Sequence, residues 1–409
     1  MDNIRGALKK SPAPVIVQTL KTALALPPAA ARTFINELTK PTSSQRTYIK
    51  HISNSFWKGT LIAKDIKYDS DAEAVRRLRR ADVVIFNIHG GGFRTGNSTM
   101  YMKSYITWID MLKEKHNLDA VMMSVEYGLA PANKYPGPLF ECMKAYKHLT
   151  QELHVPAWKI ILSGDSAGGS LVLETLMRTY APNIINDLNA PRTNFSIGLP
   201  AGVLLVSPLI TPETNSWSWE NLEKYDMVSQ QLAKLVFKEY LDFPNVDPED
   251  IPILKLARVD KDFERFSPKN ALVFVGDKEV MRDDILHLAN AIEKDGKINI
   301  RICKEAYAHD WFLIHEIVKQ KDKYMLDQYD EVFVDFAAYA VADAAENFAK
   351  EKQKQKVSTI TTTTKEDIGN VSETETAVTA QDQEQQQQQQ QQPITTTTTP
   401  VKPVGVIVP

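Results

Sequence analysis

Short apolar runs alternate with longer amphipathic segments between about Thr47 and Lys350. Runs of this length that are rich in β-branched residues predict strands, and several are apolar throughout, as expected of strands covered by helices on both faces. The six runs are Ala81–Gly90, Ala120–Gly128, Lys159–Ser166, Gly202–Pro208, Asn270–Asp277 and Ile298–Ala306. Strands that alternate with helices predict βαβ units, and hence an α/β fold with one mostly parallel, twisted sheet of about six to eight strands.

The segments between these strands carry apolar residues at helical spacing, which predicts helices. One face of a first helix carries Tyr105, Trp108, Ile109 and Leu112, and one face of a second carries Leu139, Met143, Tyr146 and Leu149. A closing helix aligns Phe333, Phe336, Ala340, Ala344 and Phe348. A continuous stripe of this kind indicates packing against the core.

A sheet of this size accounts for one catalytic domain over residues 46–352, although the length alone suggests two or three domains. We predict that residues 1–45 form a helical lid segment. An insertion at about 209–262 is predicted to form a further part of the lid, and it includes an amphipathic helix at Val228–Leu241. Residues 353–409 contain threonine and glutamine tracts. They have almost nothing to bury, so they predict a disordered tail without a catalytic role.

The composition is that of an ordinary globular protein, with 43% hydrophobic residues, 24% charged residues and a formal net charge of −3. This balance offers no electrostatic footprint for nucleic acid or an anionic membrane. Cys142 and Cys303 show no metal-ligand spacing, so no structural zinc is expected. The N-terminus lacks a secretory pattern, and its uncharged runs are shorter than the ~18 residues that span a bilayer. We expect a cytoplasmic protein without a transmembrane segment; peripheral contact with a lipid droplet or organelle surface stays open.

The sequence GDSAG at residues 164–168 follows an apolar run and leads into a helical pattern. Such a serine occupies a strained strand-to-helix turn that projects its hydroxyl, while the flanking glycines keep side chains out of the contact between strand and helix. In trypsin-like barrels the glycine-flanked serine belongs to an antiparallel architecture, which the alternation with helices argues against. The pattern resembles the nucleophile turn of α/β-hydrolases, with Ser166 as the nucleophile.

A second glycine motif, HGGG at residues 89–92, follows another predicted strand. Acyl transfer passes through a tetrahedral oxyanion that backbone N–H groups stabilise, and glycine lets the main chain approach it closely. Gly91 and Gly92 are the candidate donors, together with the N–H of Ala167 after the nucleophile. We expect His89 to order this loop rather than to act as a base.

A serine hydroxyl needs a base and an acid that orients the base, and in this chain order both follow the serine. Of the later histidines, His287 and His315 lie in helical patterns, whereas His309 lies in a loop after the last predicted strand. Because such sheets keep their sites at the carboxyl edge, His309 is the candidate base.

The acid is expected in the segment VFVGDKEVMRDD, which follows the preceding strand. Asp283 and Asp284 open a helix, where carboxylates favour the N-terminal dipole. Asp277 and Glu279 both lie in the loop before that helix. Spacing alone leaves the choice between these two open.

The chain resembles the hormone-sensitive-lipase-like family of α/β-hydrolases, which includes carboxylesterases and arylacetamide-deacetylase-like enzymes. The likeness runs from about Asp82 to Phe312, through the motifs HGGGF, EYGLAPANKYPGPLFE and GDSAGG. It implies an α/β-hydrolase fold and a lid formed in part by N-terminal helices. Gly128 stands where the family has arginine.

The resemblance also implies a choice of acid. Matching Arg282, Asp283 and Asp284 to the family's acid loop places Glu279 at the position usually held by aspartate, with Asp277 as the alternative. The segment AHDWF matches the family's histidine, glycine, phenylalanine segment, so Asp310 stands in place of the glycine.

These residues predict a serine hydrolase that cleaves carboxylic esters of uncharged, hydrophobic substrates without a metal or organic cofactor. A non-catalytic small-ligand-binding protein on the same fold and an amidase or acyltransferase with the same acyl-enzyme are the alternatives. Five aromatic residues near the motifs are candidates either for an apolar pocket or for core packing. They are Phe93, Trp108, Trp217, Trp219 and Trp311. The oligomeric state is not predicted.

Overall fold

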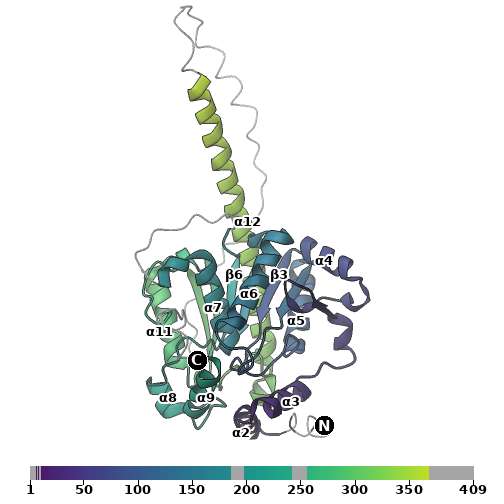
Figure 1. The fold of residues 1–409 in the computed structure, drawn as a ribbon, viewed down its shortest axis with the longest axis vertical. Coiled ribbons are helices and arrows are strands. Elements are labelled where there is room, and N and C mark those ends of the chain that lie inside the picture. The colour runs from purple at the N-terminus through teal and green to yellow at the C-terminus, as the bar shows by residue number, and fades with distance from the viewer. Residues whose placement is uncertain (1–5, 7, 9–10, 186–197, 242–255, 368–409) are drawn as a thin grey trace, which may run out of the picture. The chain divides into compact units, whose positions relative to one another are not determined.

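The computed structural model describes residues 6, 8, 11–185, 198–241 and 256–367. Within them, one eight-stranded sheet has the order β1-β2-β4-β3-β5-β6-β7-β8 (Figure 1). The strands are β1 Ile49–Ser53, β2 Lys58–Ile62, β3 Val83–Ile88, β4 Ala120–Val125, β5 Ile160–Asp165, β6 Gly202–Val206, β7 Asn270–Gly276 and β8 Asn299–Glu305. All six predicted strands are confirmed, each inside its predicted range.

The sheet is parallel from β4 through β8, and β1 and β2 extend it in antiparallel register. The inner strands β3, β4, β5, β6 and β7 are buried at every residue, which explains why their sequences are apolar throughout. Parallel strands end at the same edge, so the loops after β3, β5, β7 and β8 meet there.

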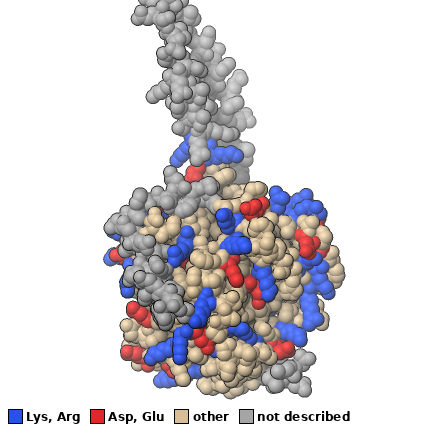
Figure 2. Space-filling view, in the orientation of Figure 1, with Lys and Arg blue, Asp and Glu red and all other residues tan. Residues whose placement is uncertain are grey.

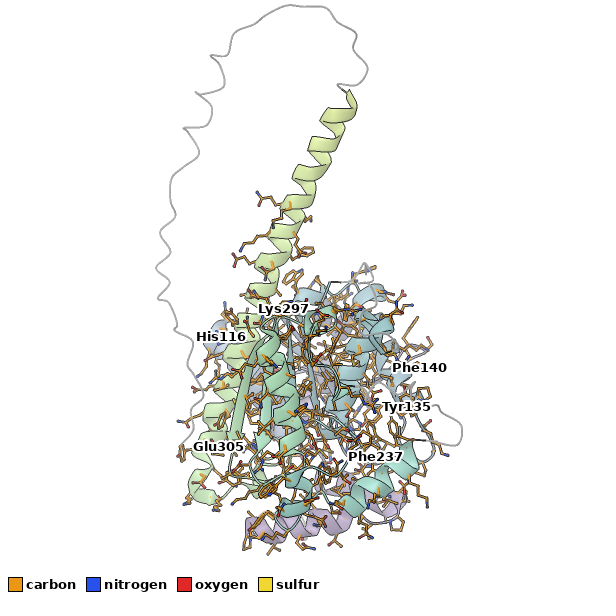
Figure 3. The ribbon with its side chains drawn as sticks, turned by 90° about the vertical axis from the view of Figure 1, so that its left-hand side faces the viewer. His116, Tyr135, Phe140, Phe237, Lys297 and Glu305 are labelled. Atoms are coloured by element: carbon orange, nitrogen blue, oxygen red, sulfur yellow. The ribbon has the colours of Figure 1, made fainter. Side chains whose placement is uncertain are left out.

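Helices cover both faces of the sheet. They are α2 Ala13–Leu24, α3 Pro28–Leu38, α4 Asp71–Arg80, α5 Met102–His116, α6 Gly137–Lys147, α7 Ser166–Tyr180, α8 Trp217–Leu222, α9 Gln230–Tyr240, α11 Arg282–Asp295 and α12 Tyr324–Asp367. Figure 3 shows His116, at the end of α5, and Phe140, on α6, on opposite sides of the sheet.

Helix α5 packs as its sequence predicts, with its apolar face against the core. Trp108 of α5 is fully buried, its ring lies 4.4 Å from that of Phe333, and its Nε1 donates to Asp330. The predicted stripe on α12 is wrong at its end, because Phe348 is 50% exposed. Helical periodicity identifies the face that packs, but it does not say how far along the helix the packing continues.

The predicted helical lid segment contains α2 and α3, and the insertion after β6 contains α8 and α9. These four helices lie near one another at the bottom of Figure 1. The amphipathic helix predicted at Val228–Leu241 is α9. Residues 242–255 of the insertion lie outside the described residues, as do residues 368–409 of the predicted disordered tail, whereas residues 353–367 continue α12.

Two arginines, the buried Arg94 and the partly buried Arg32, tie the N-terminal helices to the loop after β3. Arg94 donates to the carbonyl oxygens of Leu24 and Leu26 and pairs with Glu239 of α9 at 2.9 Å. Arg32 of α3 donates in return to the carbonyl oxygen of Arg94. The N-terminal helices and the insertion after β6 are therefore joined to the same glycine-rich loop.

Basic and acidic residues are interspersed with large uncharged areas on the face drawn in Figure 2. This distribution matches the near-neutral net charge of −3. Among the helices in the described part of the chain, none has the length and apolar character needed to span a bilayer.

Candidate active site

The turn between β5 and α7 carries Ser166. Its φ of 49° lies in the left-handed region, which a residue other than glycine occupies only at a cost, as expected of a strained nucleophile turn. A Cβ on Gly168 would lie 2.1 Å from the carbonyl oxygen of Ile88, and one on Gly164 would lie 2.6 Å from that of Gly168. The two glycines therefore permit the close contact between β5, α7 and β3 that the motif predicted.

The loop after β3 presents the glycines of the HGGG motif to the same point. Gly91 and Gly92 have φ of 103° and 61°, and Thr95 holds the carbonyl oxygen of Gly91 by donating from its N–H at 3.0 Å. Within the described residues, no hydrogen bond uses the N–H groups of Gly91, Gly92 or Ala167, and all three residues line one cavity together with Ser166. Free N–H donors at this place are what an oxyanion site requires.

Asp165, next to the serine, fixes this loop against β5. Its Oδ1 accepts from the N–H of Gly90 at 2.9 Å, and its Oδ2 accepts from the hydroxyl of Tyr101 at 3.0 Å. Burial raises the pKa of Asp165 to about 7, against the opposing effect of both hydrogen bonds. His89 donates from Nδ1 to its neighbouring carbonyl oxygen at 2.8 Å and stacks on Tyr127, in keeping with the predicted ordering role.

The loops after β7 and β8 bring Glu279 to His309. Oε2 of Glu279 lies 3.8 Å from Nδ1 of His309, and both side chains are buried. Burial lowers the pKa of His309 to about 3, so the imidazole is neutral and able to accept a proton. Burial, reinforced by the Asp226 carboxylate, raises the pKa of Glu279 well above its ordinary value. The distance is longer than a hydrogen bond, as is common for catalytic pairs without substrate.

His309 and Ser166 line the same cavity, but no hydrogen bond joins them within the described residues. Nε2 of His309 instead lies 3.2 Å from Oδ2 of Asp310. The predicted nucleophile, base and oxyanion donors thus line one cavity, and the predicted acid lies behind the imidazole, at Nδ1. The imidazole is turned toward a carboxyl group that replaces the family's glycine.

Two positioning residues have no motif in the sequence. Ser207, after β6, donates to Glu279 Oε2 at 2.6 Å, and its Oγ accepts from the N–H of Asp310 at 3.0 Å. Asp226 accepts from the N–H of His309 at 3.2 Å and from that of Val280 at 2.8 Å. Each therefore links the acid loop to the histidine loop.

The alternative acid and the other acidic and histidine candidates have partners of their own or lie exposed. Asp277 is 43% exposed at its side chain and pairs with Lys304 at 3.1 Å, so the structure favours Glu279 as the partner of the imidazole. Asp283 and Asp284 lie in the first turn of α11 and accept hydrogen bonds from α8. His287 is exposed, and His315 is buried with its Nε2 3.2 Å from the hydroxyl of Ser104.

The cavity has a volume of about 280 Å³. Its apolar walls come from α2, α3 and α9 and from the loops around them, and include Ile16, Leu20, Ile35, Leu232, Val236 and Phe237. Figure 3 labels Phe237 close to the N-terminal helices. The described residues contain no cluster of three histidine, cysteine or acidic side chains suited to a metal ion.

Of the two roles predicted for the five aromatic residues, core packing is confirmed for four, and the structure places none in the cavity wall. None of the five aromatic candidates is among the described residues that line the cavity. Phe93, Trp108, Trp219 and Trp311 are buried in the core, and Trp217 is 56% exposed. The walls are instead largely aliphatic, because the helices that supply them present leucine, isoleucine and valine at their inner faces.

The strand order and the turn at Ser166 are those of an α/β-hydrolase. The profile of the family described as alpha/beta hydrolase fold matches residues 85–313, more than half of the chain. The chain belongs to this family.

Sequence relatives agree with this assignment. A putative alpha/beta hydrolase, R526, of Acanthamoeba polyphaga mimivirus is 23% identical over 239 residues, which cover 58% of this chain and 63% of that protein. Hormone-sensitive lipase of Bos taurus is 25% identical over 191 residues, 44% of this chain and 23% of that protein. The matched segment is thus less than two thirds of either relative.

Solved structures show the same fold. A homologue of hormone-sensitive lipase from a metagenome library, EstE7, superimposes with a TM-score of 0.60 at 18% identity, over 81% of this chain and 99% of the other. Together these matches confirm the predicted resemblance to the hormone-sensitive-lipase-like family and the α/β-hydrolase fold.

Proposed function

We propose that this protein hydrolyses carboxylic esters of uncharged, hydrophobic substrates through an acyl-enzyme on Ser166. The observation that carries the proposal is the cavity shared by a strained serine, a neutral imidazole and backbone N–H groups without partners. Family membership supports it, as does the name of the bovine relative, hormone-sensitive lipase.

In the proposed reaction, Nε2 of His309 takes the proton of Ser166, and the alkoxide attacks the ester carbonyl. The N–H groups of Gly91, Gly92 and Ala167 stabilise the oxyanion. As the C–O bond breaks, its electron pair goes to the leaving oxygen, which receives the proton from Nε2. Water, activated by the same nitrogen, then releases the acid.

Glu279 is the proposed partner of Nδ1. Its carboxyl orients the imidazole and stabilises the positive charge that appears on it during proton transfer. Ser207 and Asp226 hold the two loops that carry Glu279 and His309. A small rotation of the imidazole toward Glu279 shortens the 3.8 Å separation and moves Nε2 away from Asp310.

The cavity supports an apolar substrate. Its walls are largely aliphatic, and the helices α2, α3 and α9 that form them also exclude water from the serine, which is 8% exposed. We infer that these helices act as the lid. Transfer of an apolar acyl group from water to such a surface is favourable by about 25 cal/mol per Å² of apolar area buried.

The test is hydrolysis of a series of nitrophenyl esters by the full chain and by Ser166→Ala. Loss of a true nucleophile lowers kcat by up to about 10⁶ in a well-studied triad enzyme. Equal, slow release by both proteins would overturn the proposal and favour a ligand-binding role. Anilide substrates in parallel distinguish an amidase.

The acid is tested by comparing Glu279→Gln with Asp277→Asn. We expect kcat to fall by several orders of magnitude in the first variant, because Glu279 lies at Nδ1 of the imidazole whereas Asp277 pairs with Lys304. The second variant is the matched control, since it removes a carboxylate from the same loop. A larger loss in Asp277→Asn would reverse the assignment.

A further inference from the structure

Asp310 places a carboxyl group at the reacting edge of the catalytic imidazole. Its Oδ2 lies 3.2 Å from Nε2 of His309, and the residue lines the cavity that contains Ser166. Its Oδ1 is buried and has no hydrogen-bond partner among the described residues. Only 4% of the residue is exposed.

The fold does not require a carboxyl group here. The main chain of Asp310 is satisfied by Ser207 Oγ at its N–H and by the N–H groups of Leu313 and Ile314 at its carbonyl oxygen. Its φ of 57° is a conformation that favours glycine, the residue that the related family has at this place. The side chain therefore adds strain and a buried polar atom without a partner, and both disfavour folding.

The carboxyl group of Asp310 lies on the side of the imidazole where the leaving group of the ester must be protonated. Nε2 must come within about 2.6–3.2 Å of the leaving oxygen to protonate it. An oxygen atom already 3.2 Å from Nε2 therefore lies beside that oxygen and beside the first atoms of the departing alcohol. Glu279 lies across the ring, at Nδ1, and leaves this side to Asp310.

The chemical state of Asp310 suits a hydrogen bond to a neutral polar group. Burial and the nearby carboxyl groups of Asp165, Glu279 and Asp226 raise the pKa of Asp310 well above its ordinary value. A protonated carboxyl group both donates and accepts a hydrogen bond. A hydroxyl group is complementary to it, whereas an alkyl group leaves it unpaired.

We propose that Asp310 is a specificity-determining residue that selects esters whose alcohol portion carries a second hydroxyl group, two carbons from the ester oxygen. The hydroxyl group binds the carboxyl group of Asp310, satisfies Oδ1 and draws Oδ2 away from Nε2. The imidazole is then free to serve Ser166 and, later, the leaving oxygen. This inference rests on the proposed esterase function and narrows its substrate class.

The test compares 2-hydroxyethyl butyrate with propyl butyrate, which differ by a hydroxyl group in place of a methyl group. Release of butyrate is followed by titration at constant pH. We expect the unaltered protein to favour the hydroxyethyl ester by about tenfold or more in kcat/KM, the worth of one good hydrogen bond. Asp310→Gly should remove the preference, and Asp310→Asn, which still forms hydrogen bonds, should retain part of it.

Glu316→Gln is the matched control, because Glu316 is another acidic residue that lines the cavity; its ratio should equal that of the unaltered protein. An unchanged ratio in Asp310→Gly, with hydrolysis still dependent on Ser166, would overturn this inference alone. Absence of Ser166-dependent hydrolysis of both esters would instead overturn the proposed function.

Discussion

Replacement of Glu174 by glutamine should stabilise the protein increasingly as the pH rises. Glu174 lies on α7, eight residues after Ser166, and is fully buried. Neither oxygen of its side chain has a hydrogen-bond partner within the described residues. Burial raises its pKa from 4.5 to about 8, although the Arg178 guanidinium opposes the rise. The native state therefore keeps the carboxyl group protonated at neutral pH.

The magnitude follows from the difference between folded and unfolded pKa values. Above pH 4.5 the unfolded chain loses this proton while the folded chain keeps it up to about pH 8. Stability therefore falls as the pH rises through this window, because the native state binds more protons. A pKa shift of about 3.5 units limits the loss of unfolding free energy from this group to about 5 kcal/mol, at 1.36 kcal/mol per unit.

Glutamine has nearly the same shape and does not ionise. Urea unfolding at several pH values between 5 and 8.5 measures the effect. The free energy of unfolding of the unaltered protein should fall by about 2–4 kcal/mol more than that of Glu174→Gln across this range, a part of the ceiling set by the pKa shift. Glu152→Gln removes one exposed carboxylate and should follow the unaltered protein. Parallel curves for the unaltered protein and Glu174→Gln would refute the reasoning.

Three further outcomes follow from the structure. Gly168→Ala should abolish esterase activity and lower the yield of folded protein, because its Cβ would meet the Ile88 carbonyl oxygen at 2.1 Å; a fully active, soluble variant would contradict the packing described. Arg94→Ala should lower the free energy of unfolding by about 3–5 kcal/mol, measured in urea, since it leaves Glu239 without its buried partner; a loss below about 1 kcal/mol would show that the pair is dispensable. The kcat/KM should change less than about twofold between pH 7 and pH 5, because burial lowers the pKa of His309 to about 3 and keeps the base neutral. With an imidazole of ordinary pKa, kcat/KM would fall about 25-fold over this range, because most of the base would be protonated at pH 5. A fall of that size would contradict the lowered pKa.

The sequence predicts the inner part of the fold well for a physical reason. Strands buried on both faces must be apolar throughout, and the five inner strands β3 to β7 carry that signal. The antiparallel strands β1 and β2 were not predicted. The edge strand β1 has only two of its five residues buried, so its sequence is not apolar throughout. The length of α12 was not predictable either, because the residues after Phe348 supply no apolar stripe.

Some residues of the candidate site were also predictable from the sequence, and others were not. Ser166 and the glycine loop are recognisable because a tight turn and a close backbone approach allow few residue types. Ser207 and Asp226 are not recognisable, because a hydroxyl or carboxyl group that binds a backbone N–H leaves no pattern along the chain. The aliphatic cavity wall was missed for a related reason, since leucine and isoleucine are used equally for core packing.

Covalent capture of the nucleophile tests the central claim most directly. An alkyl fluorophosphonate, which modifies activated serine hydroxyl groups, is incubated with the full chain, and the adduct is located by intact-mass and peptide mass spectrometry. We predict a single adduct on Ser166 that is absent from His309→Ala. No adduct, or an adduct on Ser104, the other serine of the cavity with a histidine partner, would contradict the account.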